Sequence, residues 1–205
     1  MPSQEEKLTT LALALVNQEV ARIVIPTYAA SPGFWFGGGN MIEDENGCLY
    51  LVGRYRNYGD SRTGLGAGER GLELAIFVSP DRGQSFEKIL SFSKNNLHLG
   101  NRQVLSIEGS ALHWHDHGVE LFVSSEKTGI GYPEGFEEFK KPGTGVWTIE
   151  RMQAESISHL QGAAIEPLME SGLPGFLRVK DPVVYNMPQG DLALLFCTHP
   201  YCWSS

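Results

Sequence analysis

The sequence lacks a basic segment, a dense set of cysteines and a long apolar run. Its 205 residues include 16 Lys and Arg against 24 Asp and Glu, a formal net charge of −8 at pH 7. Nucleic acids and anionic membranes attract basic surfaces, so this balance argues against both as partners. The three cysteines, Cys48, Cys197 and Cys202, favour free thiols over a disulfide framework, although the last two could pair. No apolar run approaches the roughly 20 residues of a membrane-spanning helix.

The first residues also lack the features of a secretory signal. Met1–Lys7 is polar and acidic, without a basic start or a long apolar core, so we expect a cytoplasmic location. Ser3 and Glu6 have the spacing of a helix capping box. Apolar residues follow at helical spacing: Leu8, Leu11, Leu15, Val16 and Val20. This predicts a helix over roughly residues 4–19 that packs on the outside of the main domain, with a mobile leader as the alternative.

Beyond residue 20 the sequence favours short strands and turns, and its 24 Gly and 11 Pro fit that pattern. We expect a first strand over Arg22–Pro26. A unit made of a short strand, a polar turn ending in Gly and a second strand then occurs three times. Its closing glycines are Gly47, Gly118 and Gly190, which lie 71 and 72 residues apart.

The repeated unit predicts an all-β fold: a partial β-propeller, about two and a half four-stranded blades, over residues 21–205. The helical segment is expected over residues 1–20. Propellers close with roughly four to eight blades, so we expect an N-terminal fragment of a longer protein or a chain completed by a partner. A compact sandwich is the alternative.

One turn has a well-defined pattern. Ser79–Phe86 reads Ser-Pro-Asp-Arg-Gly-Gln-Ser-Phe and lies between two predicted strands. Asp81 can accept hydrogen bonds from turn N–H groups, Gly83 can adopt a positive φ, and Phe86 can pack the turn onto the sheet. The pattern resembles the Asp box of sialidases and other Asp-box propellers. It implies a turn between the third and fourth strands of the first blade, away from the propeller axis.

The entrances of the innermost strands are the candidate site, because these strands converge on one central pocket. Alignment of the repeats places Gly39-Asn40, Gly109-Ser110 and Asp181-Pro182 at equivalent positions, with Glu108 just before the second pair. Two carboxylates at such entrances suit the cleavage of a glycosidic bond. One protonates the leaving group, while the other attacks, activates water or stabilises positive charge.

The segments around these two carboxylates resemble known enzymes. Ile107–Leu112 and Val179–Val184 are similar to the Glu-Gly-Pro and Asp-Pro segments of five-bladed glycoside hydrolases of families 43 and 32. The resemblance implies that Glu108 is the general acid and that Asp181 stabilises the transition state. Those families have a catalytic Asp at the entry of the first blade, where this chain has Asn40.

A second resemblance concerns the start of the domain. Arg22–Pro26, the loop that contains Asp60 and the Asp-box turn follow one another as in the opening of sialidases. This resemblance implies that Arg22 grips a sugar carboxylate and that Asp60 is the acid. Further substrate contacts are expected from Trp35, Asn40, Arg54, Arg56, Arg62, Lys180 and His199. The charged residues among them could instead form internal ion pairs, and Trp35 could belong to the core.

The alternating His113, His115 and His117 are a weak metal signal, since His117 falls in the expected hairpin turn. We therefore predict no metal and no cofactor. A carbohydrate is the expected partner, and the sequence does not predict an oligomeric state. The leading hypothesis is a glycoside hydrolase. A non-catalytic propeller that binds glycans or proteins is the alternative, and a polysaccharide lyase on the same scaffold is a third possibility.

Overall fold

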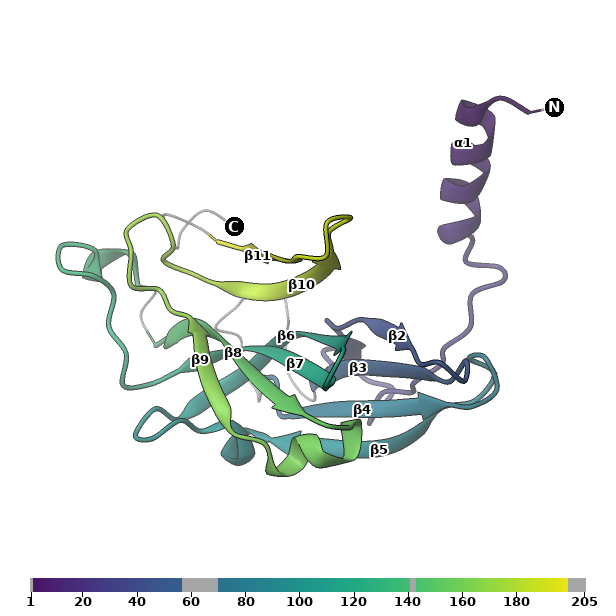
Figure 1. The fold of residues 1–205 in the computed structure, drawn as a ribbon. Helices are drawn as coiled ribbons and strands as arrows, with labels where there is room; N and C mark the ends of the chain where they lie inside the picture. Colours follow the sequence, from purple (N-terminus) through teal and green to yellow (C-terminus); the bar gives the residue numbers. More distant parts are fainter. Residues whose placement is uncertain (1, 57–69, 141–142, 199–205) are drawn as a thin grey trace.

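The computed structural model describes residues 2–56, 70–140 and 143–198, which form antiparallel sheets and one α-helix (Figure 1). The first sheet contains β1 (Trp35–Gly37), β2 (Met41–Glu43), β3 (Leu49–Arg56), β4 (Glu73–Ser79) and β5 (Glu87–Ser93). The second contains β6 (Val104–His115), β7 (Gly118–Lys127), β8 (Val146–Ala154) and β9 (Ile165–Met169). The third is the hairpin of β10 (Lys180–Asn186) and β11 (Leu192–Cys197). Short 3₁₀ helices are η2 (Lys94–Leu97), η3 (Glu137–Phe139) and η4 (Ile157–Gly162).

These sheets confirm the prediction of a partial β-propeller. The first has the order β1-β3-β4-β5, with β2 also paired to β3, and the second has the order β6-β7-β8-β9. The short β1 and β2 thus share one position, so each of these sheets has four strand positions, as a propeller blade does. β6 contacts β2 and β3 on one side and β10 on the other, so the innermost strands of consecutive sheets are neighbours.

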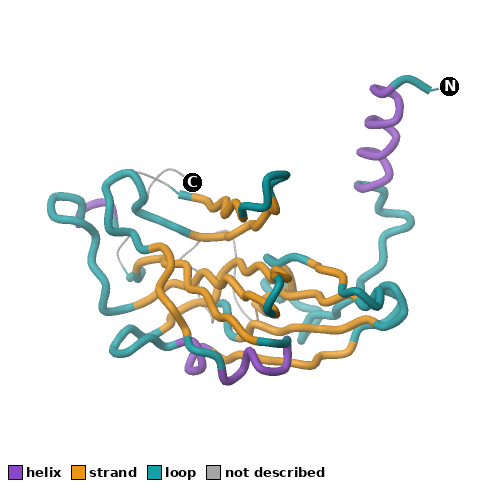
Figure 2. Tube along the Cα trace, in the orientation of Figure 1, coloured by secondary structure: helices purple, strands orange, loops and turns teal. Residues whose placement is uncertain are grey.

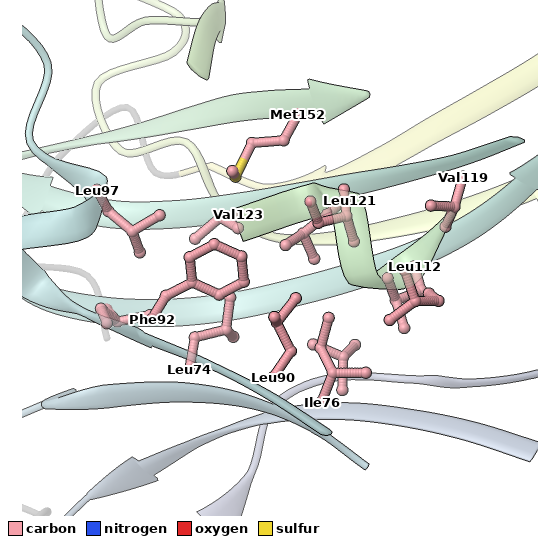
Figure 3. Close-up of a cluster of buried hydrophobic side chains, with 14 of the residues drawn as sticks. Leu74, Ile76, Leu90, Phe92, Leu97, Leu112, Val119, Leu121, Val123 and Met152 are labelled. Carbon is pink, nitrogen blue, oxygen red and sulfur yellow. The ribbon is translucent and has the colours of Figure 1, made fainter. Parts of the chain in front are cut away.

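The main core fills the space between the first and second blades (Figure 3). Leu74, Ile76 and Phe92 project from the first blade, and Leu121 and Val123 project from the second. All are at most 2% exposed. Successive side chains of a strand point to opposite faces, so the apolar residues at alternate positions meet between the sheets. Each such burial is worth about 1.5–3 kcal/mol, which holds the first two blades in a fixed relation.

The innermost strand of every blade is interrupted at the same level. In the first blade the break lies between Gly37 and Met41, the residues that end β1 and begin β2. In the second, the register of β6 shifts between Ile107 and Ser110. In the third, the register of β10 shifts between Lys180 and Val183. The three entrances that the repeat aligns are therefore three β-bulges or breaks, which redirect side chains near functional sites.

Helix α1 (Gln4–Leu15) has the predicted capping box, in which Ser3 and Glu6 hydrogen-bond each other's backbone N–H groups. The prediction that it packs on the domain is wrong. None of its residues is buried, and Figure 2 shows it standing apart from the sheets. Leu8 and Leu11 remain 59% and 56% exposed. Among the described residues, no helix is long and apolar enough to cross a membrane.

The predicted strand over Arg22–Pro26 does not form. Only Ile25 of this segment is buried, and it packs in a small cluster with Tyr55 and Phe77 on the outer face of the first blade. The run has the composition of a strand, but no strand of the first sheet pairs with it. The segment instead lies along the blade as a covering loop.

The turn between β4 and β5 has the predicted local bonds. Asp81 accepts hydrogen bonds from the Ser85 N–H (2.9 Å) and the Ser85 hydroxyl (2.6 Å), and from the hydroxyl of Ser79 (2.7 Å). Gly83 has a φ of 82°. The bonds from Ser85, followed by that from Ser79, hold the pKa of the Asp81 carboxyl well below its usual range. Because β4 and β5 are the third and fourth strand positions, this turn lies at the periphery of its blade.

Candidate functional site

The bulges of β6 and β10 bring the two predicted carboxylates into one region. Glu108 lies in the bulge of β6, and Asp181 lies in that of β10. Gly109, next to Glu108, is directly beneath Asp181: a Cβ at position 109 would lie 2.7 Å from both Cα and Oδ1 of Asp181. Only glycine fits at 109, so the close approach of the two strands depends on it.

A buried hydroxyl connects the same two strands. Ser124 of β7 donates to the carbonyl of Gly109 (3.1 Å) and accepts from the N–H of Asp181 (3.1 Å). Asp181 has a φ of 54°, a left-handed conformation that is uncommon for a residue other than glycine. A left-handed backbone conformation at a residue other than glycine persists only where neighbouring groups hold it, and here the Ser124 hydroxyl and the close contact with Gly109 do so.

The carboxylate of Glu108 is held on two sides. Its Oε2 lies 3.1 Å from a guanidinium nitrogen of Arg54, and its Oε1 accepts the hydroxyl of Ser106 at 2.7 Å. The side chains of Glu108 and Arg54 are 17% and 12% exposed, so this ion pair is largely shielded from water but still reachable. Alternation along β3 explains the contact. Val52 of that strand points into the core toward the second blade, and Arg54, two residues later, shares its face.

Trp35 completes this group. The guanidinium carbon of Arg54 lies 4.7 Å from the centre of the Trp35 ring, which is the geometry of a cation–π contact. Trp35 pairs in register with Arg56, and Gly37 pairs with Arg54, so Trp35, Arg54 and Arg56 share one face of the first blade. Three predicted site residues, Trp35, Arg54 and Glu108, therefore form one contiguous cluster.

Asn40 binds the protein itself. Its side-chain amide donates to the carbonyl of Leu112 (2.9 Å) and accepts from the N–H of the same residue (2.7 Å). Leu112 is fully buried, and this pair of bonds joins the first blade to the second. Between the second and third blades, the side chain of His113 contacts that of Asn186 at 2.9 Å. The structure thus shows that Asn40 joins two blades, and its predicted contact with a substrate stays a prediction.

The remaining predicted residues are placed differently. Arg22 donates to the carbonyl of Gly83, in the turn after Ser79. Ser79 pairs with Leu49, whereas Arg54 lies five residues further along β3, so Arg22 is about 17 Å or more from the cluster. Arg56 ends β3. Lys180 begins β10, with its ammonium 3.8 Å from the Asp181 carboxylate. Asp60, Arg62 and His199 lie outside the described residues.

The sequence reasoning missed several serines that support the site. Ser106 and Ser124 hold Glu108 and Asp181, as described above. Ser110 is 2% exposed, and its hydroxyl has no hydrogen-bond partner among the described residues. A buried unpaired hydroxyl needs an explanation, and a bound ligand or water would supply one. The signal was available, because these serines interrupt otherwise apolar strands.

Two buried ion pairs lie at the end of β7 that adjoins the site. Glu126 is fully buried and accepts from Arg70 and from the Gly145 N–H, both at 2.7 Å. The next residue, Lys127, is also fully buried, 2.6 Å from a carboxylate oxygen of Glu150. Burial lowers the pKa of Lys127, and the charge of Glu150 opposes that effect. The bonds of Glu126 tie the segments at Arg70 and Gly145 to the second blade, and the pair of Lys127 with Glu150 joins β7 to β8.

A separate hollow of about 480 Å³ lies between Glu43–Asn46 and Trp114–Gly118. It is at the hairpin ends of the strands, seven residues or about 24 Å along β6 from Glu108. Asp44 on its rim is already engaged, since it accepts from the N–H groups of Asn46 and Cys48, each at 2.9 Å. Among the described residues, no group of three or more His, Cys, Asp or Glu side chains could hold a metal ion.

No protein-family model matches the chain, and no curated protein matches it either. Among solved structures, the chain is similar to the RS223 β-xylosidase, with 10% identity and a TM-score of 0.46 over 82% of this chain and 46% of that one. It is also similar to CoXyl43, a GH43 β-xylosidase/α-arabinofuranosidase from a compost microbial metagenome, in complex with xylotriose. There the identity is 9% and the TM-score 0.45, over 84% of this chain and 45% of that one. The chain therefore spans less than half the length of either.

Proposed function

We propose that this chain is part of a glycoside hydrolase-like propeller that binds a carbohydrate at the bulges of β6 and β10. The observation that carries the proposal is the placement of Glu108 and Asp181. Their strands touch at Gly109, and each carboxylate is half-buried at the entrance of an innermost strand. Paired carboxylates of this kind supply the acid, base or charge stabilisation that glycosidic cleavage needs.

The contacts of Glu108 bear on its role. Its salt bridge with Arg54 exists only while Glu108 is ionised, whereas a general acid must donate a proton. The expected acid role therefore needs a protonated Glu108 beside Arg54, and the alternative roles of this carboxyl are those of a base or a stabiliser of positive charge. Asp181, which is 40% exposed, is the more accessible of the two carboxylates.

A sialidase-like chemistry receives less support from the described residues. It requires Arg22 as a clamp for the sugar carboxylate, and Arg22 instead contacts the peripheral turn at Gly83. The two chemistries differ in the residues that they use, so variants of Glu108 and Asp181 distinguish them.

The non-catalytic alternative is favoured by Asn40. At the first-blade entrance, where the related hydrolases have an Asp, this chain has an amide whose two polar atoms are both bonded to Leu112. A glycan-binding protein needs no third carboxylate. The cluster of Trp35, Arg54 and Glu108 offers a flat ring and polar groups for that purpose.

Either function uses a central pocket, and we propose that a further blade of a longer polypeptide completes it. Val183 and Leu195 of the third sheet are 60% and 56% exposed. They pair with each other on one face. On the second sheet, Ala111 and Phe122 also pair and are 1% and 3% exposed, in strands that β10 contacts. A sheet packed on the third blade would bury Val183 and Leu195 in the same way.

The test combines a glycan array with a reducing-sugar assay on the parent chain and on Glu108→Gln and Asp181→Asn. For an active hydrolase we expect each variant to lose at least about 100-fold in turnover while circular dichroism is unchanged. Glu166→Gln is the matched control, since Glu166 is an exposed carboxylate paired with Arg151 on outer strands. Tight binding with no product supports the non-catalytic alternative. Neither binding nor product, in the chain or its longer form, contradicts the proposal.

A further inference from the structure

Arg54 occupies an unusual place for an arginine expected to bind substrate. Its guanidinium lies between the Trp35 ring (4.7 Å to the centre) and the Glu108 carboxylate (3.1 Å), and its side chain is only 12% exposed. We propose that Arg54 is a positioning residue, which fixes the Glu108 carboxylate beside Gly109 and Asp181 and is not available to bind an acidic sugar. This inference rests on the proposed carbohydrate site.

The backbone is shaped to hold Arg54 in this position. A Cβ at Gly38 would lie 2.1 Å from a terminal nitrogen of Arg54 and 3.1 Å from its central carbon. The break between β1 and β2 therefore leaves space for the guanidinium that any other residue would fill. Gly38 also has a φ of 73°, which other residues rarely adopt, so the backbone favours glycine here, and a Cβ would in addition displace the end of the Arg54 side chain.

The geometry selects arginine over lysine. A guanidinium is planar, so it can stack on an aromatic face and donate hydrogen bonds in its plane at the same time. Arg54 stacks on Trp35 and has its charge 3.1 Å from the Glu108 carboxylate. An ammonium could keep the charge near Glu108, but it would lose the stacking that holds the guanidinium in place. The carboxylate would then be less well fixed.

The ion pair between Arg54 and Glu108 also bears on the class of substrate. A sugar carboxylate that reached Arg54 would lie beside the Glu108 carboxylate in a largely shielded place, where two like charges repel each other. Two other cations near the cluster are also paired, Arg70 with Glu126 at 2.7 Å and Lys180 with Asp181 at 3.8 Å. The described part of the site is therefore suited to a neutral polyol rather than to an acidic sugar.

The first test is structural and does not depend on activity. Crystal structures of the chain with Arg54→Met and Arg54→Lys are compared with that of the parent. We expect the Glu108 side chain in Arg54→Met to leave the position that it has in the parent. In Arg54→Lys we expect it to keep that position in part. If the Glu108 carboxylate stays in place in both variants, Arg54 does not position it and the inference is wrong. Arg54→Lys keeps this test available if Arg54→Met does not fold.

The second test uses ligands. Binding of neutral xylotriose and of the same trisaccharide bearing a glucuronic acid is measured by titration calorimetry, and turnover is measured on a panel of aryl glycosides. We expect the neutral probe to bind at least as tightly as the acidic one. On a cleaved glycoside, Arg54→Met should lower kcat at least about 10-fold with KM changed less than about threefold. Guanidinium chloride at millimolar concentration should restore part of kcat.

The matched control is Arg151→Met, which removes an Arg–Glu pair of similar length (2.9 Å to Glu166) on outer strands and should leave both probes unaffected. An acidic probe that binds tenfold tighter than the neutral one, and loses that advantage in Arg54→Met, would show a clamp and overturn the inference. If no probe binds the parent, the proposed carbohydrate function fails, while the structural test still decides the role of Arg54.

Discussion

Replacement of Asn40 by Ala tests how strongly one side chain joins the first two blades. Asn40 is the only described residue of the first-blade break whose side chain hydrogen-bonds the backbone of β6, and it makes two such bonds to Leu112. Leu112 is fully buried between the blades, whereas Asn40 itself is half-buried. Asn40→Ala should therefore leave the N–H and the C=O of Leu112 without their protein partner, in a place that water reaches only in part.

The expected cost follows from those two groups. Each buried polar group left without a partner costs about 1–3 kcal/mol, so Asn40→Ala should lower the free energy of unfolding by about 2–6 kcal/mol. Asn40→Asp should cost at least as much. Its carboxylate can still accept the Leu112 N–H, but it places a second oxygen against the Leu112 carbonyl.

Urea unfolding followed by tryptophan fluorescence measures this cost. For a chain of this size the slope is roughly 2–3 kcal/mol per molar urea, so the midpoint should fall by about 1–3 M. Asn46→Ala is the control, since Asn46 is an exposed turn residue, and its effect should stay within about 0.5 kcal/mol. If Asn40→Ala changes stability by no more than this control, the two bonds do not join the blades and our account of Asn40 is refuted.

Three further predictions concern the framework. Phe92→Ala, in the core between the blades, should cost about 3–5 kcal/mol in urea unfolding; a loss under 1 kcal/mol would show that this core is not tightly packed. The pKa of Asp81 is lowered in the folded state, so this carboxylate stabilises the fold above pH ~4, and its contribution is lost as the pH falls through the folded-state pKa. Between pH 5 and 3 the parent should therefore lose more stability than Asp81→Asn. Equal losses in the two proteins would contradict this. Lys127→Met should lower the free energy of unfolding by about 3–5 kcal/mol, because the buried Glu150 loses its ion-pair partner. The double variant with Glu150→Gln should recover most of that loss. If the losses of the two single variants simply add in the double variant, the two residues are not coupled.

The inner-strand entrances show how far sequence reasoning could reach. A repeat of 71 and 72 residues was enough to align Gly39-Asn40, Gly109-Ser110 and Asp181-Pro182, and the structure has a break or bulge at all three. This worked because strand, turn and glycine patterns are local. The turn at Asp81 was predictable for the same reason.

The contacts of the arginines were not predictable. Arginine is usually exposed, and Arg22 and Arg54 both lie next to apolar segments. The neighbouring residues therefore do not show which contact each arginine makes. Arg54 reaches Glu108 because the first and second blades pack face to face, which depends on residues 54 positions apart in the chain. Arg22 contacts Gly83 because its segment never joins the sheet.

The α1 helix shows that a correct local prediction can still give a wrong prediction of packing. Its capping box is a local signal, and it was correct. Its apolar stripe predicted packing, but a stripe indicates only that a helix could be buried, not that a surface is available to cover it. The predicted length was also too great, since the helix ends at Leu15 and the apolar residues beyond it continue in a loop.

The central claim is that a carbohydrate binds at Glu108 and Asp181, where β6 and β10 approach each other at Gly109, and a structure of the chain with bound neutral oligosaccharide tests it most directly. The account predicts a sugar ring within hydrogen-bond distance of both carboxylates, with one face toward Trp35. A sugar bound instead at the hollow between Glu43–Asn46 and Trp114–Gly118, with the Glu108 cluster unoccupied, would contradict it.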